Sequence, residues 1–313
     1  MRFPFCRLLL TCTWLMIFAL SVWSCGDGDP VVVFADSFVD AAVRGSIGKP
    51  EGPIRQSDLQ DLTRLRLWIP APVDLQGLQS CTSLVSLTIV QEGPGRTTVD
   101  STPISGLRNL VYLELKYVQV SDLGFLSQLG SLRELRIEDC VTGDLTPLAN
   151  LAGLEYLELH HNGVSEVDVD LAPLSTLGSL ATLYLTGYTL DDLAPLSSLT
   201  GLEQLYLRHC GVSDVSAISG NGNLTVLNLR GNRVSDLSPL TQLTALQTLT
   251  LDYNDIQDIS PLLGNTGLQE GDTVTITYNP LSAESVERDI PELWERGVTV
   301  RYVPVETSTV SGE

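Results

Sequence analysis

Residues 246–262 have the sequence LQTLTLDYNDIQDISPL, and the pattern within this stretch decides the fold. Leu249 and Leu251 flank a single residue, Leu246 precedes them, and the polar Asn254 follows three positions later. The same pair, or an aliphatic equivalent, recurs every 22, 25 or 26 residues along most of the chain. The pairs are Leu65/Leu67, Leu87/Ile89, Leu113/Leu115, Leu135/Ile137, Leu157/Leu159, Leu183/Leu185, Leu205/Leu207, Leu227/Leu229, Leu249/Leu251 and Val274/Ile276.

The spacing of each pair indicates a strand. In an extended chain the two leucines point to one side and the residue between them points to the other. One repeat cannot bury its leucines alone, whereas stacked repeats form a continuous apolar core. About 14 residues remain per repeat for the return path, which favours short turns or 3-10 segments over full helices. The sequence therefore predicts an α/β solenoid in which about ten strand units form a curved parallel β-sheet.

The repeats resemble those of the leucine-rich repeat family, and the 22-residue form looks like the internalin-type subclass of bacteria. The resemblance covers about residues 54–281. A polar residue follows the strand in several units, and the positions are Asn162, Asn232, Asn254 and Asn279, with Cys140 and Cys210 in two others. The resemblance implies a leucine-rich repeat solenoid, protein–protein recognition and, in some members, adhesion to host cells.

Both ends of such a solenoid need caps, because terminal repeats would otherwise expose apolar faces. Residues 34–53 are expected to form an N-terminal cap helix and linker, with Phe38 among the apolar residues and Gly45 and Gly48 ending the helix. The leucine-rich repeats then occupy 54–281. Residues 282–302 are predicted to form a C-terminal cap, a helix of about 282–296 followed by a strand at 298–300. The polar residues 303–313 are expected to form a disordered tail.

The N-terminus has the features of an export signal. Arg2 and Arg7 precede an apolar stretch of 15 residues, which is short for a membrane span and typical of a signal peptide. The residues around Cys25 resemble a bacterial lipobox, although Trp23 is bulky for its position. We expect a signal peptide at 1–24, lipidation of Cys25 and a tether at 25–33. Cleavage and simple secretion is the first alternative, and an uncleaved anchor is the second.

Charge and composition exclude several functions. The chain has 38 acidic and 18 basic side chains and a net charge of −20, which disfavours nucleic acid as a partner. No recognised catalytic motif occurs, and three histidines without ligands at recognised spacing do not predict a metal site. We therefore expect no enzyme activity, no cofactor and no metal. Cys81, Cys140 and Cys210 are interpreted as buried small apolar residues rather than as a disulfide framework.

An aspartate recurs at one phase of the repeat, immediately before an aliphatic residue. The functional alternative is a row of calcium-binding carboxylates. We favour the interpretation that each carboxylate caps the turn that follows it, which stabilises that turn by about 1 kcal/mol. The positions are Asp122, Asp144, Asp170, Asp192, Asp214, Asp236 and Asp258.

The concave face of the sheet is the candidate binding surface, because residues flanking the leucines point outward there. Tyrosine and arginine, the residue types that dominate binding hot spots, gather on this face although the chain is poor in basic residues. The alternative is that tyrosine and threonine are simply good strand formers. The predicted site comprises Tyr112, Arg136, Tyr156, Glu158, His160, Tyr184, Tyr206, Arg208 and Arg230.

These observations favour a non-catalytic protein-binding module of the bacterial cell envelope that recognises a protein or peptide on its concave face. We expect it to be exported, monomeric and attached to a membrane through a lipid on Cys25. One alternative is a structural acidic envelope protein without a specific partner. Another is a glycan or peptidoglycan binder that uses the tyrosines as a stacking platform. Fold alone does not decide among these functions.

Overall fold

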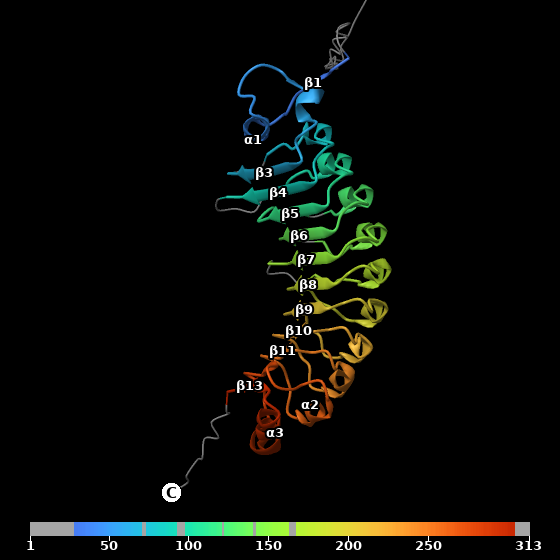
Figure 1. Cartoon of the computed structure of the whole chain (residues 1–313), viewed down its shortest axis with the longest axis vertical. Coiled ribbons are helices and arrows are strands. Elements are labelled where there is room, and N and C mark those ends of the chain that lie inside the picture. The colour runs from blue at the N-terminus through green and yellow to red at the C-terminus, as the bar shows by residue number, and fades with distance from the viewer. Residues whose placement is uncertain are drawn as a thin grey trace, which may run out of the picture.

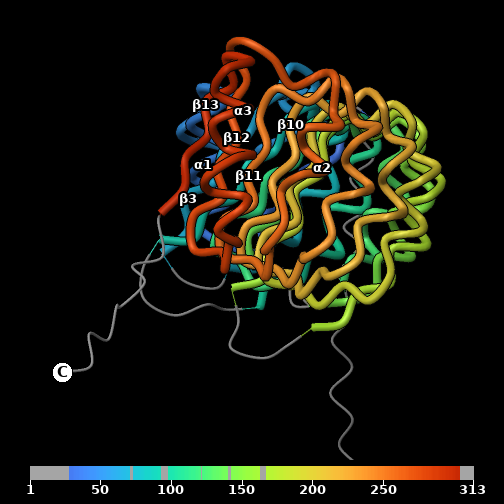
Figure 2. Tube along the Cα trace, turned by 90° about the horizontal axis from the view of Figure 1, so that it is seen from below, coloured from blue at the N-terminus to red at the C-terminus, as the bar shows by residue number. Residues whose placement is uncertain are grey.

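The computed structural model describes residues 28–70, 73–92, 98–120, 122–139, 142–162 and 167–303. These residues form a curved solenoid in which consecutive strands lie side by side in an 11-stranded sheet (Figure 1). Seen along the stack, successive turns of the chain superpose (Figure 2). The strands are β3 (Arg64–Ile69), β4 (Ser86–Gln91), β5 (Tyr112–Lys116), β6 (Glu134–Glu138), β7 (Tyr156–His160), β8 (Thr182–Thr186), β9 (Gln204–Arg208), β10 (Val226–Asn228), β11 (Thr248–Thr250), β12 (Thr273–Thr275) and β13 (Thr299–Arg301).

All neighbouring strands of this sheet are parallel, and the leucine pairs set their register. Leu183 of β8 lies opposite Leu157 of β7 on one side and Leu205 of β9 on the other. Within each central strand the leucines are buried and the residues between them are half-buried on the concave face. The predicted solenoid and its repeat phase are confirmed, since the period of the leucines and the period of the strands coincide.

The convex side consists of short 3-10 helices, as predicted from the few residues left for each return path. From residue 102 onward each begins two residues after the aspartate of its repeat, and all of them bury one leucine or isoleucine in the core, as Leu196 does. The helices are η1 (Gln56–Leu59), η2 (Leu78–Ser80), η3 (Thr102–Gly106), η4 (Gly124–Gln128), η5 (Thr146–Asn150), η6 (Ala172–Thr176), η7 (Ala194–Ser198), η8 (Ser216–Ile218) and η9 (Ser238–Gln242), and α2 (Ser260–Gly264) takes the same place in the next repeat.

The aspartates cap these turns. In every repeat where we predicted a cap, the carboxylate accepts a hydrogen bond from the backbone N–H two residues later, as Asp192 does from Ala194 at 2.7 Å. Asp74 and Asp100, which the sequence pattern did not single out, make the same contact. Hydrogen bonds from Ser238 lower the pKa of Asp236, because they stabilise the ionised carboxylate. The row of aspartates is therefore explained by local turn structure.

An N-terminal cap covers the β3 edge of the sheet (Figure 1). Helix α1 (Ser37–Ile47) begins after the capping Asp36 and ends at Gly48, which has the left-handed φ of 66°. Its buried face is Val39 and Val43. The prediction that Phe38 belongs to the apolar face of this helix is wrong, because its side chain is 51% exposed and lies away from the buried face. Gly45 does not end the helix but lies within it.

A short antiparallel pair accompanies this helix. Strand β1 (Val31–Val32), within the segment that we assign to a tether, pairs with β2 (Ile54–Arg55). The pair joins the residues before the helix to those at the start of the first repeat. The predicted signal peptide, Cys25, Cys140 and the tail from residue 304 onward lie outside the described residues.

The C-terminal end is closed by a helix and a strand. A π-helical turn, η10 (Ser285–Asp289), continues directly into α3 (Ile290–Glu295), which buries Ile290 and Leu293. Strand β13 then adds to β12 in parallel register. The predicted helix–strand cap is confirmed. Among the helices of the described residues, none has the length and apolar character that crossing a membrane requires.

Candidate functional site

The centre of the concave face carries a column of three tyrosines from successive strands. Tyr184 of β8 and Tyr206 of β9 are directly opposite in the strand register, and their rings stack with centroids 3.8 Å apart and an interplanar angle of 8°. Tyr156 of β7 lies two positions earlier in the strand register, opposite Thr182, and its ring centroid is 5.5 Å from that of Tyr184. The flat sheet spacing of about 4.8 Å brings such side chains into contact across neighbouring strands.

A charged cluster adjoins this column. The Arg136 guanidinium lies 4.3 Å from the ring centroid of Tyr156, a cation–π contact, and 3.3 Å from a carboxylate oxygen of Glu158. The Tyr156 hydroxyl donates a hydrogen bond of 2.7 Å to Glu158, and His160 Nε2 lies 3.0 Å from the other carboxylate oxygen. Glu134 also pairs with Arg136 at 2.6 Å.

These contacts shift the ionisation of the cluster. The pKa of Glu158 is lowered, chiefly by the His160 imidazole and also by the hydroxyl of Tyr156 and the charge of Arg136. The pKa of Tyr156 is raised, first by burial and then by its hydrogen bond to the Glu158 carboxylate. Burial also raises the pKa of Tyr184. At neutral pH the site therefore presents neutral tyrosines next to an ionised Glu158 and a cationic Arg136.

Arg208 extends the site from the end of β9. Its Nε atom is buried and has no hydrogen-bond partner among the described residues. A buried donor of this kind loses its hydration without compensation. An added acceptor near Arg208 would therefore supply a hydrogen bond that this buried donor lacks.

The structure divides the predicted site residues into groups. Six of them, Arg136, Tyr156, Glu158, His160, Tyr184 and Tyr206, form the connected cluster described above, and Arg208 adjoins it. Tyr112 lies two strands from Tyr156, and its hydroxyl is 3.1 Å from Glu114. Arg230 belongs to a separate group near the C-terminal end, where it lies 3.4 Å from Asp252.

Two residues that the sequence analysis missed complete the second group. The rings of Tyr253 and Tyr278 stack with centroids 4.2 Å apart, and the Arg230 guanidinium lies 4.5 Å from the Tyr253 centroid. Both tyrosines have the left-handed φ of 58° that follows the strand in several repeats. Glycine occupies the same repeat position at Gly187 and Gly231. A tyrosine at a position that otherwise holds glycine is therefore the sequence signal for this second group, and the alternation of residues within the strand did not reveal it.

In the described part of the chain, the cysteines form no disulfide and the possible metal ligands form no metal site. Cys81 and Cys210 are buried and unpaired, and burial raises their thiol pKa values to about 12 and about 11. Their predicted role as small core residues agrees with this burial. Within the described ranges, no three His, Cys, Asp or Glu side chains are grouped so that they could hold a metal ion.

Sequence and structure comparisons agree with this architecture. The family model described as leucine-rich repeats (2 copies) matches residues 200–242 and 222–264. No curated protein sequence matches the chain. The chain thus has the fold of a leucine-rich repeat solenoid, which is structurally similar to the internalins of Listeria.

Three solved structures illustrate the similarity. An internalin C2 from Listeria monocytogenes is 25% identical with a TM-score of 0.57, over 80% of this chain and 98% of that one. An internalin, inlF, from the same species is 22% identical with a TM-score of 0.58, over 88% and 92% of the two chains. The plant peptide hormone receptor RGFR1, solved in complex with RGF2, is 20% identical with a TM-score of 0.51, over 74% and 41%.

Proposed function

We propose that this protein is a non-catalytic binding module that recognises an extended segment of a protein or peptide on the central concave face. The tyrosine column of Tyr156, Tyr184 and Tyr206 is the single observation that carries the proposal. Tyrosine supplies a large, rigid contact area at low cost in side-chain entropy. Here the stacking and the hydroxyl hydrogen bonds already fix the rings, which lowers the entropy lost on binding.

The geometry favours a polypeptide over a sugar as the ligand. A sugar ring stacks on an open aromatic face. One face of the Tyr184 ring is covered by Tyr206, and Tyr156 lies on the strand at the opposite side. The column therefore presents ring edges and hydroxyl groups. Arg136, Arg208 and Glu158 beside it supply both signs of charge, and Arg208 offers a donor to a backbone or side-chain oxygen.

The likeness of fold to a plant receptor solved with its peptide hormone supports the same assignment. We propose further that the chain is exported, acts as a monomer in the bacterial cell envelope and is held on a membrane by a lipid on Cys25. The first alternative is that the chain is a structural acidic protein without a specific partner. The second alternative is that it binds a sugar.

Replacing the three tyrosines by alanine is expected to weaken binding of the partner at least 100-fold. This corresponds to a loss of about 2.7 kcal/mol in binding free energy, which is at least the loss that one interface hot-spot residue causes. The partner is first captured from envelope lysates with the processed protein. Its affinity is then measured for the wild type, for Tyr156→Ala/Tyr184→Ala/Tyr206→Ala, and for a variant with three other tyrosines removed.

The matched control is Tyr117→Ala/Tyr253→Ala/Tyr278→Ala, because these three tyrosines are exposed and lie outside the column. Both triple variants are compared at equal thermal stability. An equal affinity of wild type and column variant contradicts the site. Release of the captured partner by free sugar supports the sugar binder, and captures without any specific partner support the structural protein.

The lipid anchor has its own test. Cys25→Ser is expected to move the protein from the membrane fraction to the soluble fraction and to abolish incorporation of labelled fatty acid, because no other residue carries the lipid. Cys12→Ser, within the predicted signal peptide, serves as the matched control and should remain attached. A wild-type protein that is soluble and unlabelled would establish simple secretion instead.

A further inference from the structure

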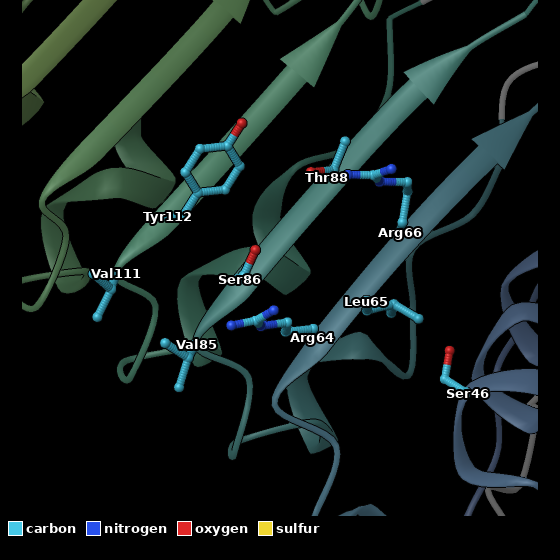
Figure 3. A pocket seen from close by; sticks show the side chains of 9 residues that line it. All are labelled: Ser46, Arg64, Leu65, Arg66, Val85, Ser86, Thr88, Val111 and Tyr112. Atoms are coloured by element: carbon cyan, nitrogen blue, oxygen red, sulfur yellow. The ribbon is translucent and has the colours of Figure 1, made fainter.

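A second concavity lies at the N-terminal end of the concave face, away from the tyrosine column. It has a volume of about 710 Å³ and opens between helix α1 and strands β3 to β5 (Figure 3). Its polar lining comprises Arg64 and Arg66 of β3, Ser86 and Thr88 of β4, Tyr112 of β5 and Ser46 of α1. Apart from Tyr112, none of these residues belongs to the predicted site.

The two arginines are the distinctive feature of this pocket. They occupy alternate positions of β3 and so lie on the same face of the strand, about 7 Å apart along it. Both side chains are exposed. Arg136 and Arg230 of the same concave face each pair with a carboxylate. Neither Arg64 nor Arg66 forms an ion pair among the residues that the structure describes.

The guanidinium groups define two separate positions for anions. Arg64 points towards Ser86 and Arg66 towards Thr88, so that the two groups extend in parallel rather than towards a common point (Figure 3). The nearest carboxylate that the lining residues contact is Glu114. It lies 3.1 Å from the Tyr112 hydroxyl and 3.4 Å from Thr88, on the side of β5, and pairs with neither arginine.

We propose that this pocket binds an acidic, extended segment of a partner protein through two carboxylates that are two residues apart. Carboxylates at alternate positions of an extended chain have the same spacing of about 7 Å as the two arginines. The planar guanidinium matches a carboxylate in a bidentate arrangement, and the hydroxyl groups of Ser46 and Ser86 add donors. A single phosphate would satisfy only one of the two positions.

The overall negative charge of −20 does not oppose this assignment. At physiological ionic strength the interaction between exposed charges is largely screened beyond about 8 Å. Arg64 and Arg66 therefore contribute more to the potential inside the pocket than the distant acidic residues do. The inference does not rest on the proposed function of the tyrosine column, and either can fail without the other.

The test uses short peptides with both ends blocked, so that only side-chain carboxylates are present. A fluorescent peptide with aspartate at alternate positions is titrated with the processed protein, and an asparagine version serves as the neutral probe. We expect binding of the aspartate peptide alone. The affinity is expected to fall at least tenfold in Arg64→Gln/Arg66→Gln and to remain unchanged in Arg108→Gln/Arg233→Gln, which removes two exposed arginines elsewhere.

Further arms separate this proposal from its competitors. The column variant Tyr156→Ala/Tyr184→Ala/Tyr206→Ala should bind the aspartate peptide as the wild type does, which keeps the two sites distinguishable. Equal binding of the asparagine peptide would overturn the proposal, as would the absence of binding at roughly 1 mM peptide. Inorganic phosphate that displaces the aspartate peptide at a concentration below the peptide's own Kd would assign the pocket to phosphate instead.

Discussion

Asn232→Ala is expected to lower the free energy of unfolding by about 4 kcal/mol. The Asn232 side chain is buried between two repeats and makes four hydrogen bonds to the backbone. Its oxygen accepts from the N–H groups of Cys210 and Val212, at 3.0 and 3.1 Å. Its amide donates to the carbonyl oxygens of Leu207 and Leu229, at 2.6 and 2.8 Å. Alanine leaves all four backbone groups without these partners, and each such buried group costs about 1–3 kcal/mol before water or relaxation relieves part of the loss.

Chemical denaturation measures this effect, with Asn223→Ala as the matched control. Asn223 is exposed and donates one hydrogen bond, to the carbonyl oxygen of Thr200. Its replacement should therefore cost about 1 kcal/mol or less. Because repeat proteins unfold in units when one interface is weak, both variants are followed by two probes from opposite ends of the solenoid. Equal losses for Asn232→Ala and Asn223→Ala would contradict the role assigned to the buried amide.

The sequence predicts this ladder only in part. Asn232 and Asn254 follow the leucine pair at a fixed distance, so their phase was visible as a polar position within each repeat. Asn221 and Asn265 were not visible in this way, because they occupy a phase that other repeats fill with leucine. Both are fully buried and donate to two leucine carbonyls of the preceding repeat. A polar residue at a core position is recognised only once the backbone groups that it satisfies are known.

The architecture is far more predictable than the contacts within the site. A strict period specifies which residues face the core and which face the concave side, since strand geometry alternates side chains. It does not specify which concave side chains touch. Tyr156 meets Tyr184 diagonally rather than in register, and Arg230 joins Tyr253 instead of the central column. These contacts depend on side-chain rotamers and on the bend after each strand, and a repeat pattern contains neither.

The bend after each strand is itself open to measurement. Gly187 follows β8 with a φ of 79°, a left-handed conformation that side chains other than glycine adopt at a cost of about 1–2 kcal/mol. A Cβ atom at Gly187 would also lie 2.2 Å from the carbonyl oxygen of His161 in the preceding repeat. Gly187→Ala therefore combines backbone strain with a clash against backbone atoms. We expect a loss of about 3–4 kcal/mol in the free energy of unfolding.

Gly211→Ala separates the two causes. Gly211 has a similar φ of 70°, but a Cβ atom there meets nothing within 4 Å. Its replacement should cost at most about 1 kcal/mol, because the backbone strain is partly offset by the lower entropy of the unfolded chain. Tyr253 and Tyr278 already tolerate the same backbone conformation where the side chain extends into solvent. Equal losses for Gly187→Ala and Gly211→Ala would show that the left-handed φ alone determines the cost, although the two glycines occupy different positions of the repeat. A larger loss for Gly187→Ala would show that the close approach of β8 to the preceding repeat requires glycine, and this approach sets the position of the strand that carries Tyr184.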